Sequence, residues 1–154
     1  MQVIQKRIKW GDNNIKQKKA LKALELQAVK WNRDRELIAI GFDPMLELAM
    51  LSEEANEFYN AESIAHKLAE FVDFMFVKMG TKAKYYSSIY ESTATFELCR
   101  SRWKVMLDWI KEVEEGMINI IECELIDQGH PDVSECILNA MQIVFDNNDL
   151  KGSE

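Results

Sequence analysis

The sequence predicts an all-α fold, a helical bundle formed by a single domain over residues 1–154. Three observations lead to this prediction. The chain holds only two prolines and six glycines, so few positions interrupt a helix. Apolar residues recur at steps of three and four over long stretches, whereas the strict alternation of strands is scarce. A length of 154 residues is that of one domain with a sizeable buried core.

The first helix is expected over about residues 15–40. Its apolar positions recur at alternating steps of three and four, broken once by Arg35: Leu21, Leu24, Ala28, Trp31 and Ile38. Trp31 is one of these positions, so we expect it in the core, although its indole ring could also stack on a base. Gly41 supplies a helix stop, and Asp43 and Pro44 follow in the order of an N-cap and a first helical residue.

The second helix is expected over about residues 44–59 and the third over about 63–79. Only a short "NAE" segment connects them, so the two helices should form an antiparallel hairpin. The segment that follows, "GTKAKYYSSIYESTAT" at 80–95, is rich in Ser, Thr and Tyr. We interpret it as a loop with some short helix.

The fourth helix is expected over about residues 95–126. Its apolar residues step by three and four in a heptad seam: Phe96, Cys99, Trp103, Met106, Ile110, Val113, Met117 and Ile120. Gly129 closes this segment, and Pro131 is expected in the first turn of a fifth helix that ends near Asn147. Because the first and fourth helices are longer than the hairpin, we expect part of a seam to meet a second subunit.

Charge and cysteine content exclude several classes of function. Acids outnumber bases by 26 to 19, and the net charge of −7 disfavours binding to nucleic acids or anionic membranes. No stretch approaches eighteen apolar residues, and the N-terminal segment lacks the apolar run of a signal peptide. Three cysteines without a C-x-x-C pair indicate a reducing compartment. A cytoplasmic protein is therefore expected.

Four acids stand out because they interrupt apolar sequence on the predicted hairpin. Glu54 and Glu57 form an i, i+3 pair on its first helix, and Glu70 and Asp73 form another on its second. The second of these helices is apolar almost all round, so buried acids there cost several kcal/mol unless they are compensated. Its lysines lie on other sides. Mg²⁺, which prefers oxygen ligands, would compensate the four carboxylates. The alternative, two solvated acidic faces, is usual for a single pair of acids.

This arrangement resembles a known family. The pattern E-x-x-E, twelve intervening residues and E-x-x-D, here "EANE" and "EFVD", is similar to that of the MazG-like all-α nucleoside triphosphate pyrophosphohydrolases. The resemblance implies that Glu54, Glu57, Glu70 and Asp73 bind Mg²⁺ and that a nucleoside triphosphate is hydrolysed to monophosphate and pyrophosphate. Glu53 or Glu54 would then orient or deprotonate the attacking water. The resemblance also implies a four-helix core and a homodimer or homotetramer.

Three further residues are candidates for substrate binding. Asn148 and Lys151 resemble the N-x-x-K ending of some members of the family, where the amide and ammonium can contact the nucleotide. A frayed helix end is the alternative interpretation. Lys78, near the end of the third predicted helix, could reach a phosphate, although a solvated surface lysine is the simpler interpretation.

Two rival functions remain open, and one is excluded. A helical adaptor, whose long seam dimerises or grips a partner, would explain the seam but leaves Glu70 and Asp73 without a purpose. Phosphoribosyl-ATP pyrophosphohydrolase is a sibling activity within the resembled family, and we rank it below a house-cleaning role on (deoxy)nucleoside triphosphates. A di-iron carboxylate bundle is excluded because neither histidine lies three residues after a glutamate.

Overall fold

The computed structural model of the chain describes residues 9–12, 14–88 and 93–151. Over these residues the regular structure is helical throughout, which confirms the all-α prediction. The helices are α1 (Asn14–Asp34), α2 (Leu37–Ile40), α3 (Pro44–Asn60), α4 (Ile64–Ser88), α5 (Thr93–Asp127) and α6 (Val133–Lys151). Among them, none has both the length and the apolar composition that crossing a bilayer requires.

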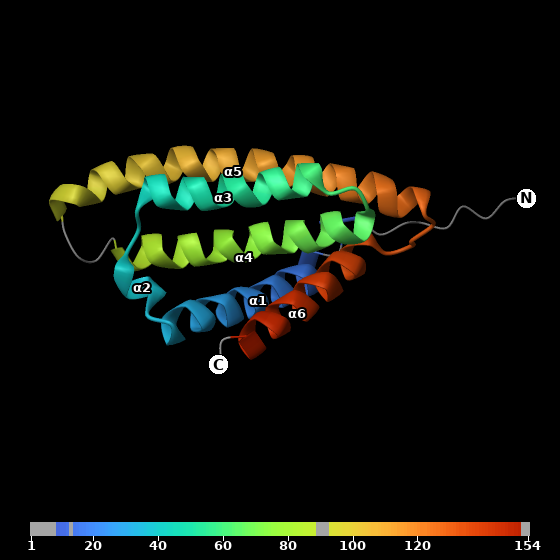
Figure 1. Ribbon diagram of the computed structural model, residues 1–154, viewed down its shortest axis with the longest axis horizontal. Coiled ribbons are helices and arrows are strands. Elements are labelled where there is room, and N and C mark those ends of the chain that lie inside the picture. Colours follow the sequence, from blue (N-terminus) through green and yellow to red (C-terminus); the bar gives the residue numbers. More distant parts are fainter. Residues whose placement is uncertain (1–8, 13, 89–92, 152–154) are drawn as a thin grey trace, which may run out of the picture.

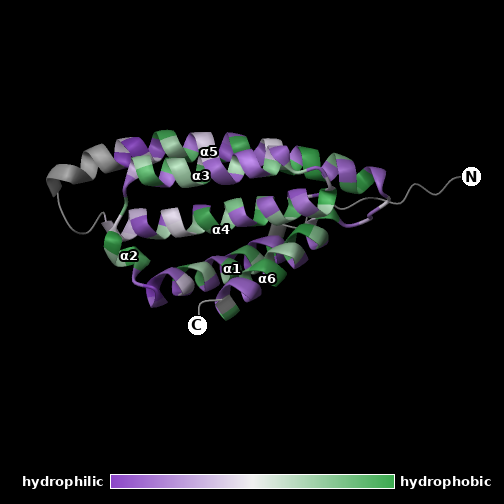
Figure 2. Ribbon diagram, viewed as in Figure 1, coloured by the Kyte–Doolittle hydropathy of each residue, from purple (hydrophilic) through white to green (hydrophobic). Residues whose placement is uncertain are grey.

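The helices form three layers, with α4 in the middle (Figure 1). α3 and α5 make one outer layer, α1 and α6 make the other, and the short α2 lies at one end. Apolar residues recur at turn-length intervals along the outer helices (Figure 2). The largest fully buried apolar side chains come from α3, α4, α5 and α6, among them Phe58, Phe71, Phe74, Ile110 and Phe145. Burying each contributes about 1.5–3 kcal/mol relative to exposure.

The prediction of one continuous helix over 15–40 was wrong, because the chain breaks between α1 and α2. The Arg35 guanidinium lies 3.9 Å from the centre of the Trp31 ring and donates a 2.9 Å hydrogen bond to the Trp31 carbonyl oxygen. This bond satisfies a carbonyl near the helix end. Glu36 then adopts a left-handed conformation, with φ of 58°, before α2 begins.

The start of α3 follows the prediction. Pro44 occupies the first turn, and the Asp43 side chain accepts hydrogen bonds from the backbone N–H groups of Met45 and Leu46. Two of the amides that a helix N-terminus leaves unpaired are thereby satisfied.

The prediction of a loop from residue 80 onward was wrong over the described part, since α4 continues to Ser88 and α5 begins at Thr93. Residues 89–92 lie outside the described residues. A Cβ on Gly80 would lie 3.0 Å from the Asn32 side chain, so glycine here permits close approach of α4 and α1. Thr81 and Tyr85 are buried on the same extension. Tertiary packing thus extends α4 through a segment of turn-like composition.

The heptad seam of α5 packs into the core over its described part. Trp103, Met106, Ile110 and Met117 are buried; Val113 and Ile120 are half-buried, and the side chains of Phe96 and Cys99 lie outside the described part.

The last helix differs from the prediction at both ends. Gly129, with φ of 85°, follows α5 as expected. α6, however, begins at Val133, and the Asp132 side chain accepts a 2.9 Å hydrogen bond from the Glu135 backbone N–H. Asp132 therefore serves as the N-cap, which leaves Pro131 before the first turn. The helix continues past Asn147 to Lys151.

Candidate metal centre

The antiparallel hairpin of α3 and α4 positions the predicted acids. Its connection is short, and the Ser63 hydroxyl oxygen accepts a 3.1 Å hydrogen bond from the His66 backbone N–H at the start of α4. Leu51 and Phe58 of α3 are fully buried, as is Phe74 of α4. Glu54 lies between Leu51 and Phe58 on the buried face of α3, so its carboxyl group lies in the interface with α4.

The carboxyl groups of Glu54, Glu57 and Glu70 meet in this interface. One oxygen of each lies within 4.8 Å of the others, so three of the four predicted ligands are brought together. Asp73 contributes to the electrostatics of the same group, since its charge acts on Glu54. The Oε2 atoms of Glu54 and Glu70 are buried and accept no hydrogen bond within the described chain. Such oxygens are costly to bury without a partner.

Burial and nearby like charges raise the pKa of two carboxyl groups of the cluster, Glu54 and Glu70. Burial, followed by the charges of Asp73, Glu57 and Glu70, raises the pKa of Glu54 to about 7. Burial also raises the pKa of Glu70, and the hydrogen bond with Glu57 and the charge of Asp73 act in the same direction. His66 partly offsets the increase at Glu70, because its Nε2 lies 3.1 Å from Glu70 Oε1. The cluster therefore carries unfavourable negative charge near neutral pH.

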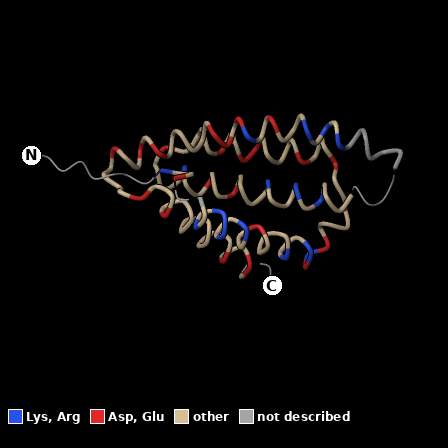
Figure 3. The backbone as a smooth tube through the Cα atoms, turned by 180° about the vertical axis from the view of Figure 1, so that it is seen from behind, with Lys and Arg blue, Asp and Glu red and all other residues tan. Residues whose placement is uncertain are grey.

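The lysines of α4 form their contacts elsewhere. Their partners are the Ala61 carbonyl oxygen for Lys67, Glu114 for Lys78, Glu25 for Lys82 and Glu47 for Lys84. In the described ranges, no lysine or arginine forms an ion pair with Glu54, Glu57 or Glu70. Figure 3 shows many acids on the two upper helices, α3 and α5, and a run of bases along part of α4, the helix below them. Within the described residues, no lysine or arginine thus neutralises Glu54, Glu57 or Glu70 by an ion pair.

The donor set of the cluster suits a hard divalent cation. Three carboxyl groups within 4.8 Å of one another, with a fourth nearby, offer oxygen ligands only. Two of these oxygens are buried without a hydrogen-bond partner in the described chain. Mg²⁺ takes oxygen ligands, keeps several waters and is commonly held by carboxylates together with substrate phosphates. The residues present therefore fit the cation that the sequence motif implies.

Glu53 and His66 border this cluster, whereas Lys78 lies further along α4. The Glu53 side chain is exposed next to Glu54. Lys78 forms a 2.6 Å ion pair with Glu114 of α5 and also lines a groove between α1 and α4. His66 bonds to Glu70 and is exposed.

Asn148 lies beside a group of aromatic side chains, one of which, Phe76, follows Asp73 by about one turn of α4. The backbone carbonyl oxygen of Asn148 accepts a 3.0 Å hydrogen bond from Trp31 Nε1. The half-buried Trp31 ring packs edge-on against Phe76, with ring centres 5.1 Å apart. Lys151 is the last residue of α6, and its side chain lies outside the described part.

One polar group of the hairpin escaped the sequence analysis. Glu47, two helical turns before Glu54, is 1% exposed and bonds to Thr81 and Lys84. The seven-residue spacing from Glu54 was a usable signal, since it places both acids on one helix face. Sequence alone does not pair Thr81 and Lys84 with it, because their segment has the composition of a loop.

Compared with protein-family models, with curated protein sequences and with solved structures, the chain shows no match. Its function must therefore be inferred from the chemistry of the carboxyl groups between α3 and α4.

Proposed function

We propose that the chain is a Mg²⁺-dependent nucleoside triphosphate pyrophosphohydrolase that releases a nucleoside monophosphate and pyrophosphate. The observation that carries the proposal is the meeting of Glu54, Glu57 and Glu70, with Asp73 beside them, around buried oxygens that lack hydrogen-bond partners in the described chain. The motif resemblance to MazG-like enzymes supports the same reading, and a house-cleaning role on (deoxy)nucleoside triphosphates fits it.

The chain's own residues would divide the work between holding the cation and preparing the water. Glu54, Glu57, Glu70 and Asp73 would hold Mg²⁺. When bound, the cation supplies positive charge that offsets the repulsion between carboxylates and phosphates. Glu53, exposed beside the cluster, or Glu54 would orient the attacking water or take its proton. Positioning and charge neutralisation account for most of the barrier reduction in such phosphoryl chemistry.

Substrate binding is proposed for Asn148, Lys151 and Lys78. The hydrogen bond from Trp31 Nε1 to the Asn148 backbone carbonyl oxygen brings the end of α6 next to an aromatic ring, and an aromatic ring can stack on a base. Lys78 would have to exchange its ion pair with Glu114 for a phosphate.

We also propose that the protein is a cytoplasmic homodimer or homotetramer that binds no nucleic acid. The net charge of −7 supports the last point. Oligomer formation is supported by an apolar groove of about 780 Å³ between α3 and α5. Met45 and Val105 in this groove are 72% and 70% exposed, as expected of a surface that a second copy covers.

The same groove favours the second candidate function, a helical adaptor without catalysis. A partner helix in the groove would bury its exposed apolar side chains. An adaptor, however, gives no reason for the unpartnered oxygens of Glu54 and Glu70. Phosphoribosyl-ATP hydrolysis is a variant of the enzymatic proposal that differs in substrate only.

A substrate panel tests the proposed activity. The purified chain is incubated with Mg²⁺ and each ribo- and deoxyribonucleoside triphosphate, and with phosphoribosyl-ATP, while pyrophosphate and orthophosphate are measured separately. We expect pyrophosphate with at least one substrate. Orthophosphate alone, or no product from any substrate, contradicts the proposal.

Matched variants connect any activity to the cluster. Glu57→Gln and Asp73→Asn should each lower turnover by about a hundredfold or more, since even outer partners of metal ligands contribute up to that much. Glu62→Gln, an exposed residue in the hairpin connection, is the control and should keep the wild-type rate. Near-normal turnover in a folded Glu57 or Asp73 variant removes that residue from the ligand set.

A further inference from the structure

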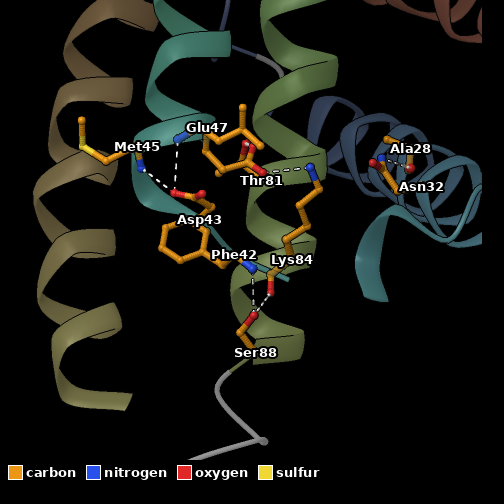
Figure 4. Close-up of polar contacts among 10 residues, drawn as sticks. Ala28, Asn32, Phe42, Asp43, Met45, Glu47, Thr81, Lys84 and Ser88 are labelled. Carbon is orange, nitrogen blue, oxygen red and sulfur yellow. Dashed lines mark hydrogen bonds and ion pairs between the residues drawn. The ribbon is translucent and has the colours of Figure 1, made fainter. Parts of the chain in front are cut away.

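A buried polar group joins α3 to α4 at the end of the hairpin opposite the connection at residues 61–63. Lys84 Nζ donates a 2.8 Å hydrogen bond to Glu47 Oε1, and Thr81 Oγ1 donates a 2.6 Å hydrogen bond to Glu47 Oε2. Glu47 is 1% exposed, Thr81 0% and Lys84 9%. Figure 4 shows the three side chains directed toward one another across α3 and α4. Both carboxylate oxygens are therefore satisfied, and we call this group the clasp.

A second set of bonds reinforces the same end. The Ser88 hydroxyl donates a 2.8 Å hydrogen bond to the Lys84 carbonyl oxygen and accepts a 3.0 Å hydrogen bond from the Phe42 backbone N–H (Figure 4). The last turn of α4 is thereby joined to the segment that leads into α3.

The clasp lies about two helical turns from the acid cluster on both helices of the hairpin. Seven residues separate Glu47 from Glu54 on α3, and eight separate Asp73 from Thr81 on α4. Both spacings are close to two helical turns, or about 11 Å along the axis. The cluster therefore lies between the clasp on one side and the covalent connection on the other. Carboxyl groups that repel one another are restrained at both ends of the hairpin.

The buried ion pair of the clasp restricts the relative position of α3 and α4 more narrowly than apolar contacts do. Apolar burial is non-directional, so it opposes sliding or rotation of α3 against α4 only through the fit of their buried side chains. A buried glutamate and lysine tolerate no such movement, because separating them leaves uncompensated charges in the interior. Replacing a whole buried ion pair by apolar residues, in contrast, is often neutral for stability. Geometry and stability can therefore be separated by experiment.

We propose that Glu47, Thr81 and Lys84 are positioning residues that hold the carboxyl groups of Glu54, Glu57, Glu70 and Asp73 together for a divalent cation. This inference rests on the proposed function, because it assigns the cluster a cation. The clasp itself touches neither cation nor substrate.

The test replaces the whole clasp by apolar side chains and measures cation affinity. The variant Glu47→Leu/Thr81→Val/Lys84→Met should unfold cooperatively at a temperature no lower than that of the wild type. Its affinity for Mn²⁺, measured by electron paramagnetic resonance of the free ion, should fall about tenfold, the scale of outer-shell effects on metal sites.

A matched control removes an ion pair of the same helix that faces away from the cluster. Glu25→Leu/Lys82→Met replaces a 2.7 Å pair between α1 and α4 and should leave the Mn²⁺ affinity within about twofold of wild type. If the triple variant does not fold, Thr81→Val alone is used. It removes one hydrogen bond to Glu47 and should weaken Mn²⁺ binding, whereas Lys84→Arg, which keeps the charge, should bind nearly as the wild type does. Unchanged Mn²⁺ affinity in the clasp variants, or an equal loss in the control, overturns the proposal.

A second readout separates failure of this inference from failure of the proposed function. Spin labels at Ala49→Cys and Ser87→Cys, two exposed positions near the clasp, report the separation of α3 and α4 in a chain whose three native cysteines are replaced by serine. Without metal, the clasp variant should give a longer or broader distance distribution. An unchanged distribution overturns the inference even if the wild type binds Mn²⁺. If the wild type binds no Mn²⁺, the proposed function fails, and the positioning role for a cation fails with it.

Discussion

The raised pKa of Glu54 makes the stability of the fold depend on pH. A carboxyl group whose pKa is higher in the folded state than in the unfolded state stabilises the fold while it is protonated. Glu54, with a pKa raised from 4.5 to about 7 by burial and then by Asp73, Glu57 and Glu70, belongs to this class. Its contribution is fully present below pH 4.5 and is lost as the pH rises through about 7. The raised pKa of Glu70 changes the stability with pH in the same direction.

The metal-free protein should therefore lose thermal stability as the pH rises from 5 to 8. The folded state binds more protons than the unfolded state in this window, so the free energy of unfolding falls with increasing pH. Thermal unfolding in the presence of a chelator at pH 5, 6, 7 and 8 measures the effect. Glu54→Gln should flatten the dependence, whereas Glu112→Gln, an exposed position on α5, should keep the wild-type slope. Equal slopes in the wild type and Glu54→Gln would show that Glu54 is not held in this environment.

The acids themselves could be recognised from sequence because apolar neighbours made them conspicuous. Glu70 and Asp73 interrupt a segment that is otherwise apolar, and the structure places Glu70 with Glu54 and Glu57 as expected. Glu47 gives a weaker signal, since no acid follows it at i+3 or i+4. Its partners Thr81 and Lys84 become recognisable only when the helix is known to extend past Gly80.

At the scale of elements, the differences between prediction and structure come from contacts that are distant in sequence. The chain continues helically through "GTKAKYYSS" because Gly80 allows α1 to approach and because Thr81 and Lys84 bond to Glu47 of α3. Local composition there is that of a turn, and tertiary packing overrides it. The apolar pattern is interrupted at Arg35, where α1 has ended, but it does not specify that Arg35 folds back over Trp31.

The α3–α5 layer leads to a prediction about assembly. One face of this layer packs on α4 (Figure 1). The groove between α3 and α5 carries exposed apolar residues of both helices. A second identical layer would complete a four-helix arrangement, and two-fold symmetry brings the same surface to both sides. We expect light scattering to give two or four times the chain mass, and Val105→Glu to lower it.

A control variant distinguishes this surface from general apolar exposure. Ile143→Glu changes a residue of α6 that is 62% exposed, and it should leave the assembly intact. A wild-type chain that is monomeric at about 100 µM, or the same mass for Val105→Glu as for wild type, would contradict the assignment of this face.

At the scale of the whole molecule, α4 is the element on which the others depend. It lies between two outer layers and contributes core residues, two of the four candidate ligands, and the Thr81 and Lys84 parts of the clasp (Figure 1). Composition and periodicity were sufficient to predict helices and a bundle. They were insufficient to predict the layer order, because many arrangements bury the same apolar stripes.

We propose that carboxyl groups from α3 and α4 bind one divalent cation together, and the proposed activity requires it. Thermal unfolding with and without Mg²⁺ tests it without reference to any substrate. At a Mg²⁺ concentration about a hundred times the dissociation constant, binding adds about 2.7 kcal/mol, which corresponds to a shift of roughly 5–10 °C for a chain of this length. We predict this shift for the wild type and its loss in Glu54→Gln/Glu70→Gln. A wild type that does not respond to Mg²⁺, or a double variant that shifts as much as the wild type, would contradict the claim.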